Sequence, residues 1–204
     1  MAALPAPSSS VKRQVLFVQG GGEHVHDDWD GKLVESLSAA LGPDYELRYP
    51  RMPDEDDPSY ATWKAALEKE FAALNADAIL VGHSIGGTIL INALAECRPE
   101  RRFGAIILIA APFVGEGGWR SQDWQPQREL GSKLPVGVPV YLFHGLADDT
   151  APPSHVDLYS QAIPQAHTCL LPGRDHQLNN DLTDIATAII SLPGETTARP
   201  PSAR

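Results

Sequence analysis

A serine stands between two glycines in the segment Gly82-His83-Ser84-Ile85-Gly86, directly after a short apolar run. A sharp turn from strand to helix at this point would lift the Ser84 hydroxyl above a sheet, and the glycines would let neighbouring segments pack closely. The first N–H groups of the following helix have no acceptor within that helix, so they can stabilise an oxyanion. The pattern therefore predicts that Ser84 is a nucleophile in acyl-transfer chemistry.

A serine nucleophile needs a base, and the base needs an acid that orients it. Two aspartates, Asp148 and Asp149, follow a later apolar run, and His176 follows the last one. Aspartates in a loop are often only turn formers, and a lone histidine is often a surface residue. Here the order nucleophile, acid, base, with each after a strand, predicts a Ser-His-Asp triad, and either aspartate can supply the acid.

Three consecutive glycines, Gly20 to Gly22, follow the first apolar run. Glycines let backbone N–H groups approach a developing negative charge, so we expect the N–H groups of Gly21 and Ile85 to form an oxyanion hole. A phosphate-binding loop is the alternative, but the spacing fits neither of the common glycine-rich phosphate motifs.

Short apolar runs alternate with helical patterns along the chain. The runs comprise residues 15–18, 45–49, 78–81, 105–110, 138–143 and 168–171. The helical patterns cover residues 33–41, 60–74, 85–97, 156–162 and 178–189. Most runs are continuously apolar, which is typical of parallel strands covered on both faces. The chain is therefore expected to form an α/β fold with a mostly parallel sheet of about six strands and helices on both faces.

The sequence also predicts an edge strand, a helix cap and the place where the reactive loops meet. The run from Tyr45 to Tyr49 alternates, with Glu46 and Arg48 facing away from the apolar side, which favours an edge strand. Asp57 precedes Pro58 and is expected to cap the helix that follows. Reactive groups collect at the carboxyl ends of parallel strands, so the loops with the serine, the aspartates and the histidine should meet there.

Composition limits the possible functions. The 204 residues include 16 Lys and Arg against 26 Asp and Glu, a formal charge of −10, which argues against a nucleic-acid partner. No apolar run approaches the roughly 20 residues that span a bilayer, so no membrane association is expected. We expect one domain over residues 11–193, with loose tails at 1–10 and 194–204.

The two cysteines and the N-terminal residues favour one cellular compartment over others. Cys97 and Cys169 lie in apolar contexts, which suits two buried thiols in a reducing compartment better than a disulfide. The N-terminal residues lack the basic flank and apolar centre of a secretory signal. We therefore expect a cytoplasmic protein, and no motif calls for a cofactor.

Taken together, these motifs resemble a known group, the small α/β-hydrolases of the serine hydrolase family typified by retinoblastoma-binding protein 9. The resemblance covers about residues 11–192 and includes Trp63, the serine turn, the His-Gly-x-x-Asp loop, the final Asp-His pair and the loop Met52-Pro53-Asp54. It implies a compact six-stranded α/β-hydrolase fold and hydrolysis of carboxylic esters. It also implies that the triad is Ser84, Asp148 and His176.

This sequence departs from the family pattern at two places, both of which bear on the shape of the pocket. Gln19 stands where many relatives have His or Pro, and His176 follows Arg174-Asp175 rather than two glycines. Larger relatives insert a lid between the fourth and fifth strands, but here residues 113–137 are too few for a cap domain.

The site is therefore expected to be open. We expect Trp119 and His83 to contact substrate, while Trp119 and Trp124 are each equally well explained by packing of their loop.

The segment His24-Val25-His26-Asp27-Asp28-Trp29-Asp30 suggests a metal site, because His and carboxylate clusters bind zinc. It nearly matches the ligand run of metallo-β-lactamase-like hydrolases, except that Trp29 replaces a histidine. We favour a polar loop in which an aspartate caps the next helix, and we expect no metal. The acidic residues 54–57 lack the spacing of a calcium loop.

The sequence thus predicts a serine hydrolase that cleaves esters of small, accessible substrates through an acyl-enzyme. Thioesterase, amidase or acyltransferase activity on the same triad is the first alternative. The second is a non-catalytic binding protein that keeps the fold. The expected partner is a small-molecule ester, and the sequence does not indicate an oligomeric state.

Overall fold

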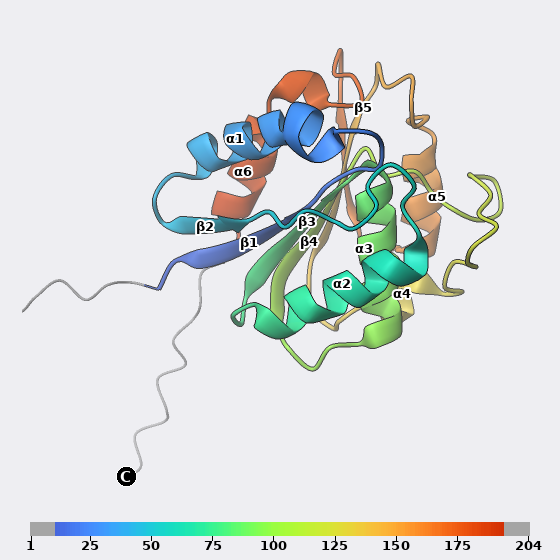
Figure 1. Cartoon of the computed structure of the whole chain (residues 1–204), viewed down its shortest axis with the longest axis horizontal. Helices are drawn as coiled ribbons and strands as arrows, with labels where there is room; N and C mark the ends of the chain where they lie inside the picture. Colours follow the sequence, from blue (N-terminus) through green and yellow to red (C-terminus); the bar gives the residue numbers. More distant parts are fainter. Residues whose placement is uncertain (1–10, 194–204) are drawn as a thin grey trace, which may run out of the picture.

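The computed structural model describes residues 11–193 and contains a single sheet of six parallel strands (Figure 1). The strands are β1 (Arg13–Val18), β2 (Tyr45–Arg48), β3 (Ala78–His83), β4 (Phe103–Ile109), β5 (Val140–Gly145) and β6 (His167–Leu171). Their order is β2-β1-β3-β4-β5-β6, with every neighbouring pair parallel. The expected α/β fold is confirmed, while the expected tails at 1–10 and 194–204 lie outside the described residues.

Helices cover both faces of the sheet. They are α1 (Asp30–Leu41), α2 (Tyr60–Ala73), α3 (Ser84–Cys97), α4 (Leu130–Lys133), α5 (His155–Ala162) and α6 (Thr183–Ile190). A π-helical turn, η1 (Val25–Trp29), precedes α1, and a 3-10 turn, η2 (Leu178–Asn180), precedes α6. Helices α1 and α6 pack together on one face, whereas α2, α3 and α5 lie on the other (Figure 1).

The central strands are buried on both sides, which explains their continuous apolar runs. In β1, Val15 and Phe17 face the core under α1 and α6. Their neighbours Leu16 and Val18 face the core under α2 and α3. By contrast, β2 lies at an edge and is only partly buried, as its alternating sequence predicted.

The start of α2 differs from expectation. Its N-cap is Ser59, whose Oγ accepts a hydrogen bond from the N–H of Thr62 at 3.3 Å. The predicted cap, Asp57, lies two residues too early because the chain continues through Pro58 before it becomes helical. The prediction of Asp57 as the cap was therefore wrong.

Residues 113–137 form a loop with little regular structure. Apart from the four-residue helix α4, this segment contains one isolated bridge, between Val114 and Trp119. No separate cap domain is formed among residues 11–193. The carboxyl edge of the sheet is therefore uncovered on this side.

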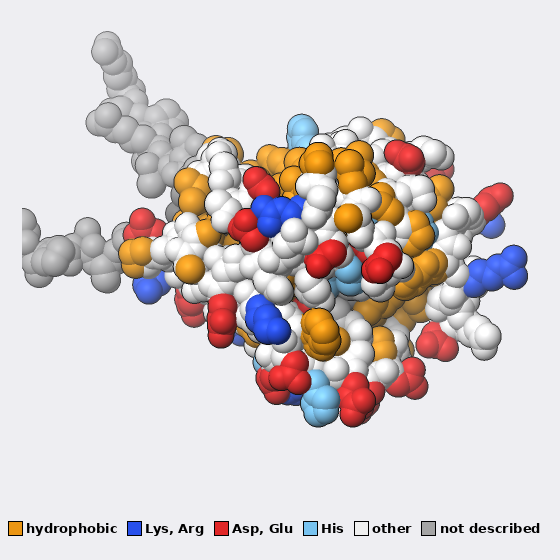
Figure 2. Space-filling view, turned by 90° about the horizontal axis from the view of Figure 1, so that it is seen from above, with side chains coloured by type: hydrophobic (Ala, Val, Ile, Leu, Met, Phe, Trp, Pro, Cys, Tyr) orange, Lys and Arg blue, Asp and Glu red, His pale blue; other side chains and the backbone are white. Residues whose placement is uncertain are grey.

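On the face shown in Figure 2, acidic and basic side chains are interspersed among apolar ones. None of the helices within residues 11–193 combines the length and the apolar character needed to cross a membrane.

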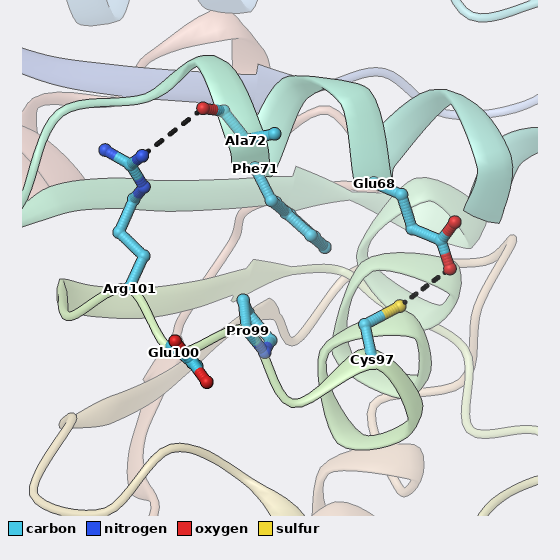
Figure 3. A pocket seen from close by; sticks show the side chains of 7 residues that line it. All are labelled: Glu68, Phe71, Ala72, Cys97, Pro99, Glu100 and Arg101. Carbon is cyan, nitrogen blue, oxygen red and sulfur yellow. Dashed lines mark hydrogen bonds between the residues drawn. The ribbon is translucent and has the colours of Figure 1, made fainter.

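Both cysteines are only partly buried and are not paired with each other, so the expectation of buried thiols was wrong. Cys97 lines an open pocket of about 570 Å³ beside the ends of α2 and α3 (Figure 3). Its Sγ donates a hydrogen bond to Glu68 at 3.1 Å, and burial, followed by this carboxylate, raises the pKa of Cys97 to about 12. Cys97 is therefore a thiol at neutral pH and a poor nucleophile.

Candidate active site

Ser84 occupies a strained turn at the junction of β3 and α3. Its φ angle is +50°, a region that non-glycine residues rarely adopt. A Cβ added to Gly86 would lie 1.9 Å from the carbonyl oxygen of Gln19, and one added to Gly82 would lie 2.5 Å from the Cα of Gly87. The close approach of α3 to the ends of β1 and β3 therefore requires glycine at both positions.

The structure brings Ser84 next to the predicted base. His176 follows β6, and its Nε2 lies 3.0 Å from Ser84 Oγ. Its other ring nitrogen, Nδ1, lies 2.8 Å from Oδ2 of Asp148, which follows β5. The three side chains therefore form a continuous chain of hydrogen bonds from a hydroxyl to a carboxylate, the geometry needed to activate a serine.

Four nitrogen atoms lie within 3.0 Å of the Asp148 carboxylate oxygens. Its Oδ1 accepts the N–H groups of Thr150 and Ala151, both at 2.9 Å. Its Oδ2 faces His176 and also Nε2 of His144, at 3.0 Å. Burial alone would raise the pKa of this carboxyl, but the hydrogen bonds from His144 and His176 outweigh burial and hold the pKa well below its usual range. Asp148 is therefore a carboxylate at neutral pH.

The neighbouring aspartate points elsewhere. Asp149 is exposed, and its side chain makes no hydrogen bond within residues 11–193. The structure thus brings Asp148, and not Asp149, to His176. His144, near the end of β5, was missed as a site residue, although its spacing of four from Asp148 was a usable signal.

The three glycines after β1 use their N–H groups differently. Gly20 donates to Asp30 Oδ2 at 2.7 Å, and Gly22 donates to the carbonyl oxygen of Glu55 at 2.7 Å. The N–H of Gly21 has no acceptor within the described part of the chain. Ile85 lies in the first turn of α3, and a Cβ on Gly21 would be 3.0 Å from its Cγ2. The two expected oxyanion donors therefore belong to residues that lie against each other.

A cavity of about 380 Å³ opens directly above Ser84 and His176. Its wall includes Trp119, which is 38% exposed. Trp124 lies outside this cavity and stacks on Tyr60, with ring centroids 4.3 Å apart. Other lining side chains are Val25, Asp56, Pro58, Ile85, Thr150 and Gln177.

Gln19 departs from the family pattern but does not line the cavity. Its buried side chain donates to Glu55 Oε2 at 2.5 Å and accepts the N–H of Met52 at 3.0 Å. It therefore ties the end of β1 to the loop after β2.

His83, an expected substrate contact, borders the cavity but is only 1% exposed. Its Nδ1 lies 2.9 Å from Asp30 Oδ2, and its Nε2 lies 3.1 Å from the carbonyl oxygen of His176. Asp30 was expected at most to cap α1, but it is fully buried and makes no such cap. The η1 turn directs it inward, and nothing in the local sequence distinguished it from its acidic neighbours.

The histidines of the suggested metal segment face different partners. His24 is exposed and lies 3.5 Å from Glu23, whereas His26 stacks on Tyr49, with ring centroids 4.1 Å apart. Within residues 11–193, no three or more His, Cys, Asp or Glu side chains converge as a set of metal ligands.

Comparison with known proteins identifies a family whose model matches the chain, together with solved structures that share its fold. The model of the family described as "Alpha/beta hydrolase family" matches residues 15–201. No curated protein sequence matches the chain significantly.

Several solved structures share the fold. The esterase RhEst1 from Rhodococcus sp. ECU1013 superposes with a TM-score of 0.65 at 18% identity, covering 89% of this chain and 92% of that one. A bromoperoxidase from Bacillus anthracis gives 0.66 at 15% identity, covering 88% and 91%. XC6422 from Xanthomonas campestris, described as a serine hydrolase without lid, gives 0.58 at 20% identity, covering 94% and 88%. At such identities, these likenesses show the fold alone.

Proposed function

Because the chain belongs to the alpha/beta hydrolase family, we propose that it is a serine hydrolase that cleaves carboxylic esters of small, accessible substrates. One observation carries the proposal. Ser84 Oγ, His176 and Asp148 are linked by contacts of 3.0 and 2.8 Å at the base of an open cavity.

In the proposed reaction, Ser84 Oγ attacks the ester carbonyl carbon while His176 Nε2 takes its proton. Asp148 stabilises the imidazolium that forms. The N–H groups of Gly21 and Ile85 donate to the oxyanion of the tetrahedral intermediate. The C–O bond then breaks, the alcohol leaves with the proton from His176, and the acyl group stays on Ser84. Water, activated by His176, releases the acid in the same way.

The cavity supports small and uncharged substrates. Its volume of about 380 Å³ lies near the lower end of the usual range for ligand pockets. Asp56 lines it, whereas no described Lys or Arg does. An anionic acyl group would therefore meet the Asp56 carboxylate without a Lys or Arg side chain to offset it.

The likeness to the retinoblastoma-binding protein 9 type remains a prediction from sequence motifs, because no comparison links the chain to that type. The cytoplasmic location and the absence of a cofactor also remain predictions. Thioester, amide and acyl-transfer reactions use the same triad, so matched oxygen ester, thioester and amide substrates should be compared directly.

The decisive experiment compares wild type with Ser84→Ala, using a fluorophosphonate probe and p-nitrophenyl esters of increasing acyl length. We expect wild type to be labelled, and we expect Ser84→Ala to lose labelling and about 10⁴-fold in turnover. Ser132→Ala, an exposed serine on α4, is the matched control and should behave as wild type. An unlabelled, inactive wild type would favour the binding-protein alternative, and an active Ser84→Ala would refute the proposal.

A further inference from the structure

We propose that Asp30 and His83 form a buried positioning pair that ties the oxyanion loop to the loop that carries the catalytic base. The inference rests on the proposed function of Gly21 and His176. The pair lies beneath the cavity, and neither side chain takes part in the proposed chemical steps.

Asp30 connects the pair to the oxyanion loop. A single carboxylate oxygen, Oδ2, accepts the N–H of Gly20 at 2.7 Å and faces His83 Nδ1 at 2.9 Å. The other oxygen, Oδ1, has no hydrogen-bond partner among residues 11–193. Because Gly20 directly precedes Gly21, this contact fixes the backbone from which an oxyanion donor projects.

His83 connects the pair to the base. Its Nε2 faces the carbonyl oxygen of His176 at 3.1 Å, so it holds the backbone of the residue whose ring contacts Ser84. A carbonyl oxygen and a carboxylate can only accept hydrogen bonds. His83 must therefore donate from both ring nitrogens, which makes it an imidazolium paired with the Asp30 carboxylate.

The surroundings of His83 support this charge state. The groups that face it are Asp30 from α1, Asp148 from the loop after β5, and the ring of His176, whose centroid is 5.0 Å away. Burial by itself lowers the pKa of His83, but the Asp30 carboxylate outweighs it and raises that pKa. Burial likewise favours a neutral Asp30, yet His83 outweighs it and lowers the pKa of Asp30. Both shifts favour the charged forms of the two partners, in agreement with the contacts that His83 makes through both ring nitrogens.

Asp30→Asn tests the pair without a change in size. The amide oxygen can still accept from Gly20 and from a neutral His83 protonated at Nδ1, but Nε2 then has no proton to donate to His176. We expect kcat to fall about 10²-fold with KM little changed, because loss of this bond misplaces the base. Asp28→Asn, the same change at an exposed site nearby, is the control.

A second substitution separates positioning from packing. In Asp30→Asn/His83→Gln, the glutamine amide offers an N–H to the His176 carbonyl without requiring a charge. We expect the kcat of this double variant to be about tenfold higher than that of Asp30→Asn, because a tenfold change corresponds to the gain of one modest contact. Wild-type kcat in Asp30→Asn, or a double variant slower than the single one, would overturn the proposal.

A measurement on wild type does not depend on turnover. In protein with ¹⁵N-labelled histidine, with His83 assigned by comparison with His83→Gln, both ring nitrogens of His83 should be protonated at about pH 8, where a free histidine is neutral. A neutral His83 would refute the buried pair. A protein that shows the imidazolium but hydrolyses no ester would instead contradict the proposed function.

Discussion

His144 contacts Asp148 from the end of β5: its Nε2 lies 3.0 Å from Asp148 Oδ2, the oxygen that also faces His176. His144 is 1% exposed, and the same nitrogen lies 2.9 Å from the carbonyl oxygen of Ala151. Asp148 is therefore held by the N–H groups of its own loop and by the end of β5, whether or not His176 is protonated.

Asp148→Asn should lower kcat by about 10⁴-fold, because an amide at this position favours the wrong tautomer of His176. Asp149→Asn makes the same chemical change at the exposed neighbour and should cost less than about twofold, within the effect of an ordinary surface substitution. Initial rates of p-nitrophenyl ester hydrolysis at about pH 8, where an unperturbed histidine is neutral, provide the measurement. Loss of activity in Asp149→Asn with an active Asp148→Asn would show that the other aspartate is the acid.

Asp148 should also contribute to stability in a pH-dependent way. Its pKa is lowered in the folded protein, so its contribution is complete above the unfolded pKa of about 3.9 and is lost as pH falls through the folded value. The difference in unfolding free energy between wild type and Asp148→Asn should therefore be largest at neutral pH and shrink below about pH 4. Urea unfolding at several pH values measures it. A difference that is constant with pH would contradict the lowered pKa.

Gly86→Ala should destabilise the protein by about 3 kcal/mol and impair the serine turn, because the new Cβ would lie 1.9 Å from the Gln19 carbonyl oxygen. Gly42→Ala provides a contrast, since Gly42 has a positive φ but open space around it. That variant should lose only the backbone cost of about 1–3 kcal/mol and keep its activity, because Gly42 lies far from Ser84 in the chain and its φ and ψ of 73° and −165° suit glycine alone. Urea unfolding and ester turnover of both variants test this, and equal losses of turnover would contradict the close approach of α3 to β1.

Substitution of Trp119 should change KM, whereas substitution of Trp124 should change stability. Trp119→Ala removes a wall of the cavity and should raise KM about tenfold for a butyryl ester, the equivalent of one apolar contact. Trp124→Ala removes a stack on Tyr60, so it should lower the melting temperature and leave KM within about twofold. Steady-state kinetics and thermal unfolding of both variants provide the test. A larger KM effect at Trp124 would mean that substrate occupies another groove.

The sequence was sufficient for the order of the elements and for the serine turn, because both follow from strong local patterns. Continuous apolar runs require burial on both faces, and Gly82 and Gly86 are required by backbone contacts beside Ser84. The choice between Asp148 and Asp149 was different. Residue type alone did not distinguish the two aspartates. The prediction of Asp148 rested on the His-Gly-x-x-Asp spacing of the resembled family, and the structure then showed the geometry of the loop.

Asp30 shows why the rest could not be predicted. It follows two exposed aspartates and a half-exposed tryptophan, so its local sequence indicates a polar surface loop. Its burial depends on the η1 turn and on His83, which is 53 residues away in the chain. Such long-range pairings of polar side chains leave no periodic signal in the sequence.

The uncovered carboxyl edge has a consequence for the fate of an acyl-enzyme. Residues 113–137 place no domain over Ser84, and His176 keeps 14% of its side chain exposed. In the proposed reaction, bulk water therefore competes with every other acceptor for the acyl group throughout its lifetime on the serine. The partition ratio should favour the free acid over transfer to an added alcohol, so the same short loop that leaves the cavity open also biases this fold towards hydrolysis.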